Sequence, residues 1–104
     1  MAIIEITKAN FDEEVLKYKG VVLIDFWASW CAPCNMLSPV IDQVAGEHNE
    51  IKVVKVNVDE QGELAGKFGI HSIPTLVVMK DGVEVKRTSG LMSKSEVEAL
   101  FSGI

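Results

Sequence analysis

Cysteine is scarce in this chain of 104 residues, which contains only Cys31 and Cys34. Two cysteines cannot form the disulfide framework that stabilises many small secreted domains. Nearly half of the residues are hydrophobic, which is enough for a core, and no low-complexity tract indicates disorder. A close cysteine pair with no further cysteines indicates redox chemistry or half of a metal site.

The chain also lacks an excess of basic residues and any long apolar run. Its formal net charge of -5 argues against a nucleic acid partner, because phosphates are bound by clusters of lysine and arginine. The apolar runs are strand-sized, well short of the roughly 20 residues of a membrane span. The first five residues carry no basic segment typical of a signal peptide. We therefore expect a cytoplasmic, monomeric protein with one domain over residues 1–104 that binds neither nucleic acid nor membrane.

The spacing of apolar residues predicts alternating strands and helices. Strands are expected over residues 3–6, 21–27, 51–58, 75–80 and 83–88. Helices are expected after Asn10, after the cysteine pair, over about 61–68, and after Ser93. Asn10 and Ser93 each precede a glutamate by three positions, which is the pattern of a capping box.

The order of these elements predicts an α/β fold. The first three strands alternate with helices, which favours parallel pairing through right-handed crossovers. Asp81 and Gly82 between the last two strands are typical of a two-residue hairpin, which makes those strands antiparallel. The prediction is a mixed sheet with helices on both faces.

The cysteine pair stands where the predicted strand 21–27 gives way to a helix. The first amides of a helix have no partner within it and the helix dipole is positive there, so a thiolate is stabilised. We predict that Cys31 is exposed and attacks a substrate disulfide, and that Cys34 is buried and resolves the mixed disulfide. Pro33 would stiffen the ring between the two sulfurs, and Trp30 would form a partly exposed wall beside them.

Other roles of the pair are weaker alternatives. A structural disulfide around so small a loop would stabilise the fold by only about 2 kcal/mol. Zinc and iron-sulfur sites usually need four ligands, and neither His48 nor His71 stands at ligand spacing, so we expect no metal. A binding module in which the sulfurs are incidental is a further alternative, and it predicts that a Cys31→Ser variant keeps full activity.

Asp25 lies within an apolar stretch, where a charged carboxylate is costly because it loses its water. Burial is therefore expected to raise the pKa of Asp25. We predict that Asp25 is a general base for the Cys34 thiol; the alternative is a strand-end aspartate that reaches solvent or a backbone amide. Lys55 in the third predicted strand could temper the charge of Asp25, or else lie at a sheet edge with its ammonium in water.

Taken together, these features resemble the thioredoxin family, in the family's order and spacing and over essentially the whole chain. The residues that carry the resemblance are Asp25-Phe26-Trp27-Ala28, Trp30-Cys31-Ala32-Pro33-Cys34, Pro39, the strand end at 55–59, Ile73-Pro74-Thr75 and Gly90. The resemblance implies a thioredoxin fold, with a central five-stranded mixed sheet flanked by four helices.

The resemblance also implies the shape of the site. Pro74 would follow a cis peptide bond opposite the cysteines, which leaves the backbone of Ile73 free to pair with an extended substrate segment. Trp30, Ile73 and Gly90 would line a shallow apolar groove around Cys31. Such a groove reads backbone and shape more than side chains, which suits many protein substrates.

The activity implied is that of a protein-disulfide reductase, with electrons supplied by a thioredoxin reductase. The FAD and NADPH of that reaction belong to the reductase, so this chain would carry only the redox-active disulfide Cys31–Cys34. A disulfide oxidase or isomerase is the alternative within redox chemistry. Those relatives often have a histidine between the cysteines, whereas Ala32 and Pro33 offer no such charge, and reduction is favoured.

Two residues depart from the family's usual pattern. Ala32 replaces a glycine and adds a methyl group to the contact surface, which could alter which partners fit. Asn35 replaces a lysine that commonly follows the second cysteine, so a nearby positive charge is missing and the Cys31 thiolate is less favoured. A modest shift in reduction potential is expected.

The Asn35→Lys variant is expected to restore that charge and to make the Cys31 thiol more acidic. Titration of Cys31 in the reduced variant and in the wild type would measure the change. A titration midpoint that is unchanged or higher in the variant would contradict the expectation.

Overall fold

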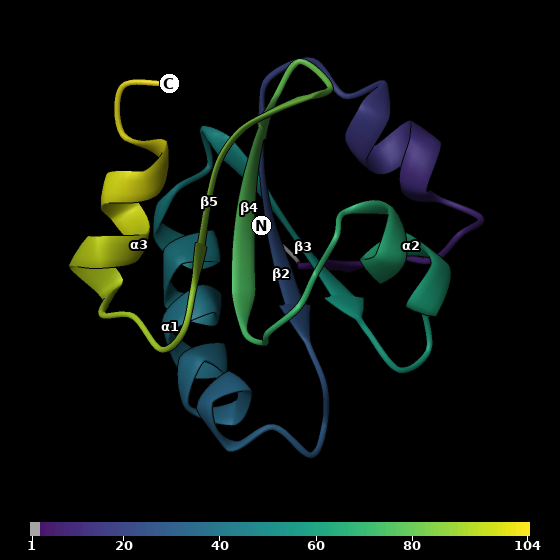
Figure 1. The fold of residues 1–104 in the computed structure, drawn as a ribbon. Coiled ribbons are helices and arrows are strands. Elements are labelled where there is room, and N and C mark those ends of the chain that lie inside the picture. The colour runs from purple at the N-terminus through teal and green to yellow at the C-terminus, as the bar shows by residue number, and fades with distance from the viewer. Residues whose placement is uncertain (1–2) are drawn as a thin grey trace.

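Residues 3–104 are the part of the chain that this computed structural model describes, and in them strands alternate with helices except at the hairpin of the last two strands (Figure 1). The elements are β1 (Ile4–Glu5), the π-helix η1 (Asp12–Leu16), β2 (Val21–Trp27), α1 (Ala32–Glu47), β3 (Ile51–Asn57), α2 (Gly62–Lys67), β4 (Thr75–Lys80), β5 (Val83–Ser89) and α3 (Lys94–Phe101). Within the described range, no helix is both long and apolar enough to cross a membrane.

The five strands form one mixed sheet in the order β1-β3-β2-β4-β5. β3 runs parallel to both β1 and β2, while β4 is antiparallel to β2 and to β5. The predicted α/β class, with a five-stranded mixed sheet and four helices, is therefore confirmed. The register sets Lys55 of β3 between Glu5 of β1 and Asp25 of β2.

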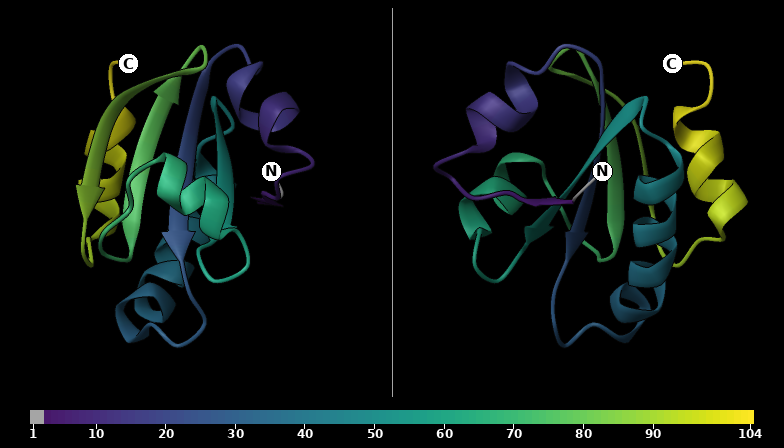
Figure 2. Two further views of the ribbon diagram at one scale, coloured as in Figure 1. Left: turned by 45° about the vertical axis from the view of Figure 1, so that its right-hand side comes forward. Right: turned by 180° about the vertical axis from the view of Figure 1, so that it is seen from behind.

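Helices cover both faces of the sheet. Figures 1 and 2 show α1 and α3 on one face and η1 with α2 on the other. Because side chains alternate along a strand, the three central strands β2, β3 and β4 each contribute to both layers of the core. On the α1 face Leu23 and Leu76 pack with Leu37, whereas on the opposite face Ile24 and Phe26 belong to the second cluster.

Two local signals in the sequence are found where they were expected. The Asp81-Gly82 turn has positive φ at both residues (50° and 83°), as a tight hairpin between twisted strands requires. A Cβ on Gly82 would lie 2.4 Å from the Leu16 carbonyl oxygen, so a side chain does not fit there. Ser93 and Glu96 form the predicted capping box at the start of α3.

The capping box predicted at Asn10 is wrong. The helix that follows is the short π-helix η1, which starts after Phe11 and has no side-chain cap. The Asn10 carboxamide instead accepts a hydrogen bond from the Thr7 N–H (2.7 Å) and donates one to the Glu5 carbonyl (3.0 Å). These bonds close the turn after β1, which is itself shorter than the predicted strand.

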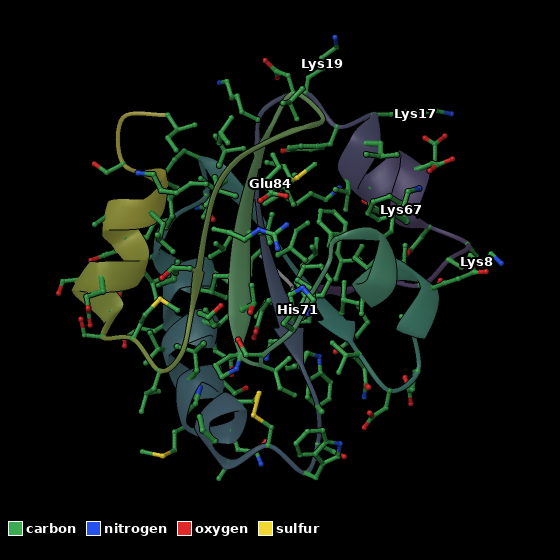
Figure 3. The ribbon with its side chains drawn as sticks, in the orientation of Figure 1. Lys8, Lys17, Lys19, Lys67, His71 and Glu84 are labelled. Carbon is green, nitrogen blue, oxygen red and sulfur yellow. A yellow bond between two sulfur atoms is a disulfide. The ribbon has the colours of Figure 1, made fainter. Side chains whose placement is uncertain are left out.

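The exposed ion pairs contribute little to the stability of this framework. Figure 3 shows Lys8, Lys17 and Lys67 on the side of the molecule where η1 and α2 lie. Lys8 forms an ion pair with Glu63 at 2.7 Å, with both side chains about three-quarters exposed. Exposed pairs of this kind are worth roughly 0–1 kcal/mol, so the two apolar layers carry the stability.

Leu37→Ala is expected to lower the free energy of unfolding by about 2–5 kcal/mol, because it leaves a cavity under α1 where Leu37 is fully buried. The neighbouring Met36 is 63% exposed, so Met36→Ala is the matched control and should change stability by less than about 0.5 kcal/mol. Urea unfolding of both variants would test this, and equal losses would contradict the assignment of the core.

Candidate active site

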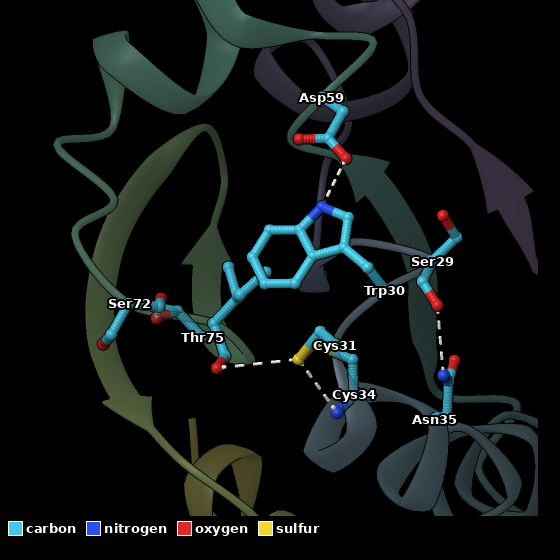
Figure 4. The surroundings of a disulfide bond; sticks show 9 residues. Ser29, Trp30, Cys31, Cys34, Asn35, Asp59, Ser72 and Thr75 are labelled. Carbon is cyan, nitrogen blue, oxygen red and sulfur yellow. Dashed lines mark hydrogen bonds between the residues drawn. A yellow bond between two sulfur atoms is a disulfide. The ribbon is translucent and has the colours of Figure 1, made fainter.

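The two cysteines lie at the carboxyl end of β2, where α1 begins, and they form a disulfide with their Cα atoms 5.2 Å apart (Figure 4). Cys31 is the N-cap residue of α1, with extended backbone angles. Its Sγ accepts a hydrogen bond from the backbone N–H of Cys34 at 3.2 Å. The sulfur therefore occupies the position in which a serine or aspartate oxygen usually satisfies the first turn of a helix.

Cys31 is not the exposed residue that its position in the sequence predicted. Its exposed fraction is 5%, close to the 3% of Cys34. Cys31 is buried because Trp27, Val58 and Ile73 pack against the cluster that holds the two cysteines. The Ile73 carbonyl oxygen lies 3.8 Å from Cys31 Sγ, so the loop before β4 covers the sulfur on one side.

This covering loop is held in place by several hydrogen bonds. The Ile73–Pro74 peptide bond is cis, and Pro74 is buried. The Thr75 hydroxyl donates to the Ser72 carbonyl at 2.6 Å. The Gly90 N–H donates to the Pro74 carbonyl at 2.9 Å, and Gly90 has a φ of 98°, which favours glycine. The strand ends of β4 and β5 thus fix Ile73 and Pro74 against Cys31.

Trp30 forms the expected wall beside the sulfur and is 70% exposed. Its indole Nε1 donates a 2.7 Å hydrogen bond to Asp59 Oδ2, which fixes the ring despite its exposure (Figure 4). Trp30 and Ile73 share a surface pocket of about 170 Å³ that also includes Ile70. Asp59 was not predicted as part of the site, because only the packing of the β3–α2 loop brings it to Trp30.

The two residues between the cysteines, Ala32 and Pro33, lie in the first turn of α1. Ala32 and Pro33 are exposed beside the disulfide, so the Ala32 methyl group lies on the accessible surface. Asn35 Nδ2 donates a 3.2 Å hydrogen bond to the Ser29 carbonyl, which ties α1 to the loop that carries Trp30. This tie was not predicted, since the sequence indicated only a missing charge at that position.

Asp25 is 2% exposed and shares the α1 face of the sheet with Lys55. Loss of water on burial raises the pKa of Asp25 from an ordinary value of 3.8 to about 7. The positive charge of Lys55 opposes this rise, while Glu5 and Asp42 add to it. Among residues 3–104, Asp25 Oδ1 has no hydrogen-bond partner. The burial on which the predicted rise in pKa depends is therefore confirmed.

A cavity of about 150 Å³, with mostly polar lining residues, lies between Asp25 and Cys34. The residues that line it are Glu5, Asp25, Trp27, Cys34, Asn35, Ser38 and Lys55. Lys55 Nζ donates to Ser38 Oγ at 2.9 Å and lies 3.9 Å from Asp42 Oδ1, so it faces α1 and acts on Asp25 at longer range. A cavity of this size and polarity can hold water between a thiol and a carboxylate.

The two histidines do not join the cysteines. His71 lies on the exposed loop before β4 (Figure 3), beside the pocket at Trp30. His48 caps the other end of α1, where its ring nitrogens contact Glu98 at 2.7 Å and Glu50 at 2.8 Å. These two carboxylates raise the pKa of His48, which favours a protonated clamp over a metal ligand.

Comparison with known proteins gives a consistent result over nearly the whole chain. The family model described as Thioredoxin matches residues 2–102. The thioredoxin of Porphyra purpurea is 45% identical over 103 residues, which cover 98% of this chain and 96% of the relative. The thioredoxin of Bacillus subtilis is 46% identical over 103 residues (98% and 97%), and that of Pseudomonas aeruginosa is 44% identical over 100 residues (95% and 93%).

Asp25→Asn is expected to stabilise the disulfide form at alkaline pH. The carboxylate binds its proton more tightly in the folded state, where its pKa is about 7, than in the unfolded chain, where it is near 4. The free energy of unfolding of the wild type therefore falls as pH rises from 4 to 7, by up to about 4 kcal/mol from this group. The Asp25→Asn variant has no carboxyl group at this position, so this loss of stability with rising pH does not occur in it.

Urea unfolding at pH 4, 5.5, 7 and 8.5 would measure the effect. The stability of Asp25→Asn relative to the wild type should grow between pH 4 and 7 and then level off. Asp12→Asn removes an exposed carboxylate on η1 and serves as the matched control. A difference independent of pH would show that Asp25 does not titrate as described.

Proposed function

Since this chain belongs to the thioredoxin family and is a thiol-disulfide oxidoreductase, we propose that it acts as a reductase of protein disulfides. The observation that carries this proposal is the place of Cys31 at the start of α1, with the Cys34 N–H directed at its Sγ. In the reduced protein the same N–H and the helix dipole stabilise a thiolate on Cys31.

In the first step the Cys31 thiolate attacks one sulfur of a substrate disulfide. The substrate S–S bond breaks, a mixed disulfide forms between Cys31 and the substrate, and the released substrate thiolate takes up a proton. The exposed Ala32 and Pro33 face the incoming chain. The backbone of Ile73 pairs with an extended substrate segment, while Trp30 and Gly90 flank it.

In the second step Cys34 resolves the mixed disulfide. Asp25 takes the proton of the Cys34 thiol as general base, through water in the cavity that both residues line. The Cys34 thiolate attacks Cys31 Sγ, the bond from Cys31 to the substrate breaks, and the second substrate thiol leaves. The substrate gains two electrons and two protons, and the Cys31–Cys34 disulfide forms. Lys55 tunes this step through its charge near Asp25.

A thioredoxin reductase with FAD and NADPH returns the disulfide to the dithiol. The chain itself needs no bound cofactor for this exchange. We place the protein in the cytoplasm as a single-domain monomer, where a reducing environment keeps the cysteines ready to react.

Reduction of insulin disulfides, with dithiothreitol or a reductase as electron source, tests the proposal. Cys31→Ser should abolish turnover, because the nucleophile is lost. Cys34→Ser should also abolish it but should trap a covalent adduct with the substrate through Cys31, detectable by non-reducing electrophoresis or mass spectrometry. An adduct on Cys34 in the Cys31→Ser variant, with none in Cys34→Ser, would reverse the assigned roles.

A further inference from the structure

Glu5, Lys55 and Asp25 form one row across three neighbouring strands. Strand pairing sets Glu5 of β1 opposite Lys55 of β3, and Lys55 opposite Asp25 of β2. All three side chains line the cavity under α1 that also reaches Cys34. The row runs from the buried centre of the sheet to its edge, because Asp25 is 2% exposed whereas Glu5 is an exposed residue of the outermost strand.

This geometry matters because the proton that leaves Cys34 must reach solvent. Asp25 is buried, and its Oδ1 has no hydrogen-bond partner in the described part of the chain, residues 3–104. Buried polar atoms beside a polar cavity are usually satisfied by water. The cavity of about 150 Å³ therefore offers a route from Asp25 outward, and its remaining lining residues decide where the route ends.

Glu5 is the lining residue suited to that end. Asn35 and Trp27 carry no group that gains or loses a proton, and Ser38 Oγ accepts from Lys55. Lys55 donates a hydrogen bond to Ser38 and lies near Asp42, so its ammonium group already has partners. Among the cavity-lining residues within 3–104, only Glu5 combines a carboxylate with contact to solvent.

We propose that Glu5 is the outer end of a proton path that runs from the Cys34 thiol through Asp25 to solvent. This inference rests on the function proposed above. The proton leaves Cys34 Sγ for the Asp25 carboxylate, passes through water in the cavity to the Glu5 carboxylate, and is released to bulk water. No electrons move in these transfers. Glu5 acts through Asp25, so it is a positioning residue and not a catalytic one.

The charges around both carboxylates fit such a path. Partial burial on the cavity side raises the pKa of Glu5, the positive charge of Lys55 opposes this rise, and the negative charge of Glu60 adds to it. Lys55 likewise lowers the pKa of Asp25, whereas Glu5 and Asp42 raise it. The repulsion between the two carboxylates favours a state in which one of them holds the proton and the other is free to receive it.

The resolving step can be isolated with 5,5′-dithiobis(2-nitrobenzoate) and the reduced protein. Attack by Cys31 releases one thionitrobenzoate, and attack by Cys34 on the resulting mixed disulfide releases the second, so stopped-flow absorbance separates the two steps. In dilute buffer at neutral pH, Glu5→Gln should slow the second phase by about three- to tenfold, a part of the hundredfold or more that a general base contributes. Added imidazole should restore the wild-type rate, because it carries the proton instead.

Two matched variants complete the test. Glu5→Asp keeps a carboxylate at the cavity and should stay close to the wild-type rate. Glu60→Gln removes the same charge from a neighbouring exposed residue that does not line the cavity, and it should show no dependence on buffer. The proposal is overturned if Glu5→Gln resolves as fast as the wild type in dilute buffer, if its loss is not restored by imidazole, or if Glu60→Gln is equally slow.

The Asp25→Asn variant separates this inference from the function on which it rests. If Asp25→Asn slows the second phase and Glu5→Gln does not, only the path through Glu5 fails. If Asp25→Asn is also as fast as the wild type, the role of Asp25 as general base fails with it.

Discussion

The candidate site of this protein is organised around one hydrogen bond, from the Cys34 N–H to Cys31 Sγ at the start of α1. A helix needs an acceptor at its first turn, and here that acceptor is a sulfur atom of the disulfide. Folding of α1 therefore also fixes the position of this sulfur. β2 ends at this point, and the loop that precedes its neighbour β4 covers the sulfur from the same end of the sheet.

The second constraint is the charge of Asp25 inside the sheet. An apolar residue there would stabilise the fold, since the buried carboxylate costs free energy whenever it is ionised. The raised pKa of Asp25 means that the carboxylate can hold or release a proton near neutral pH, as the general base proposed for Cys34 would have to do. Lys55 and the polar cavity limit the cost without removing it. Stability and reactivity are thus set against each other at one position.

Local signals predicted the parts of the structure that neighbouring residues determine. The Asp81-Gly82 turn and the Ser93 capping box needed only a few adjacent residues, and β2 and β4 followed from short apolar runs. The Asn10 prediction failed because its carboxamide bonds backward to Thr7 and Glu5, an equally local alternative that the pattern does not distinguish.

The prediction that Cys31 is exposed failed for a different reason, because Ile73, which lies far along the chain, covers it. The strand end at 55–59 was part of the family resemblance, but the contact of Asp59 with Trp30 depends on loop packing, and the place of Glu5 depends on strand register.

The closeness of Cys31 and Cys34 also affects how the protein responds to oxidation by peroxide. Oxidation of an isolated thiolate proceeds from a sulfenic acid to sulfinic and sulfonic acids that cannot be reversed in the same way. Here a sulfenic acid on Cys31 lies within bonding reach of the Cys34 thiol, and their condensation yields water and the intramolecular disulfide. That product is the ordinary oxidised state of the protein, so the damage would be repaired in the next catalytic cycle.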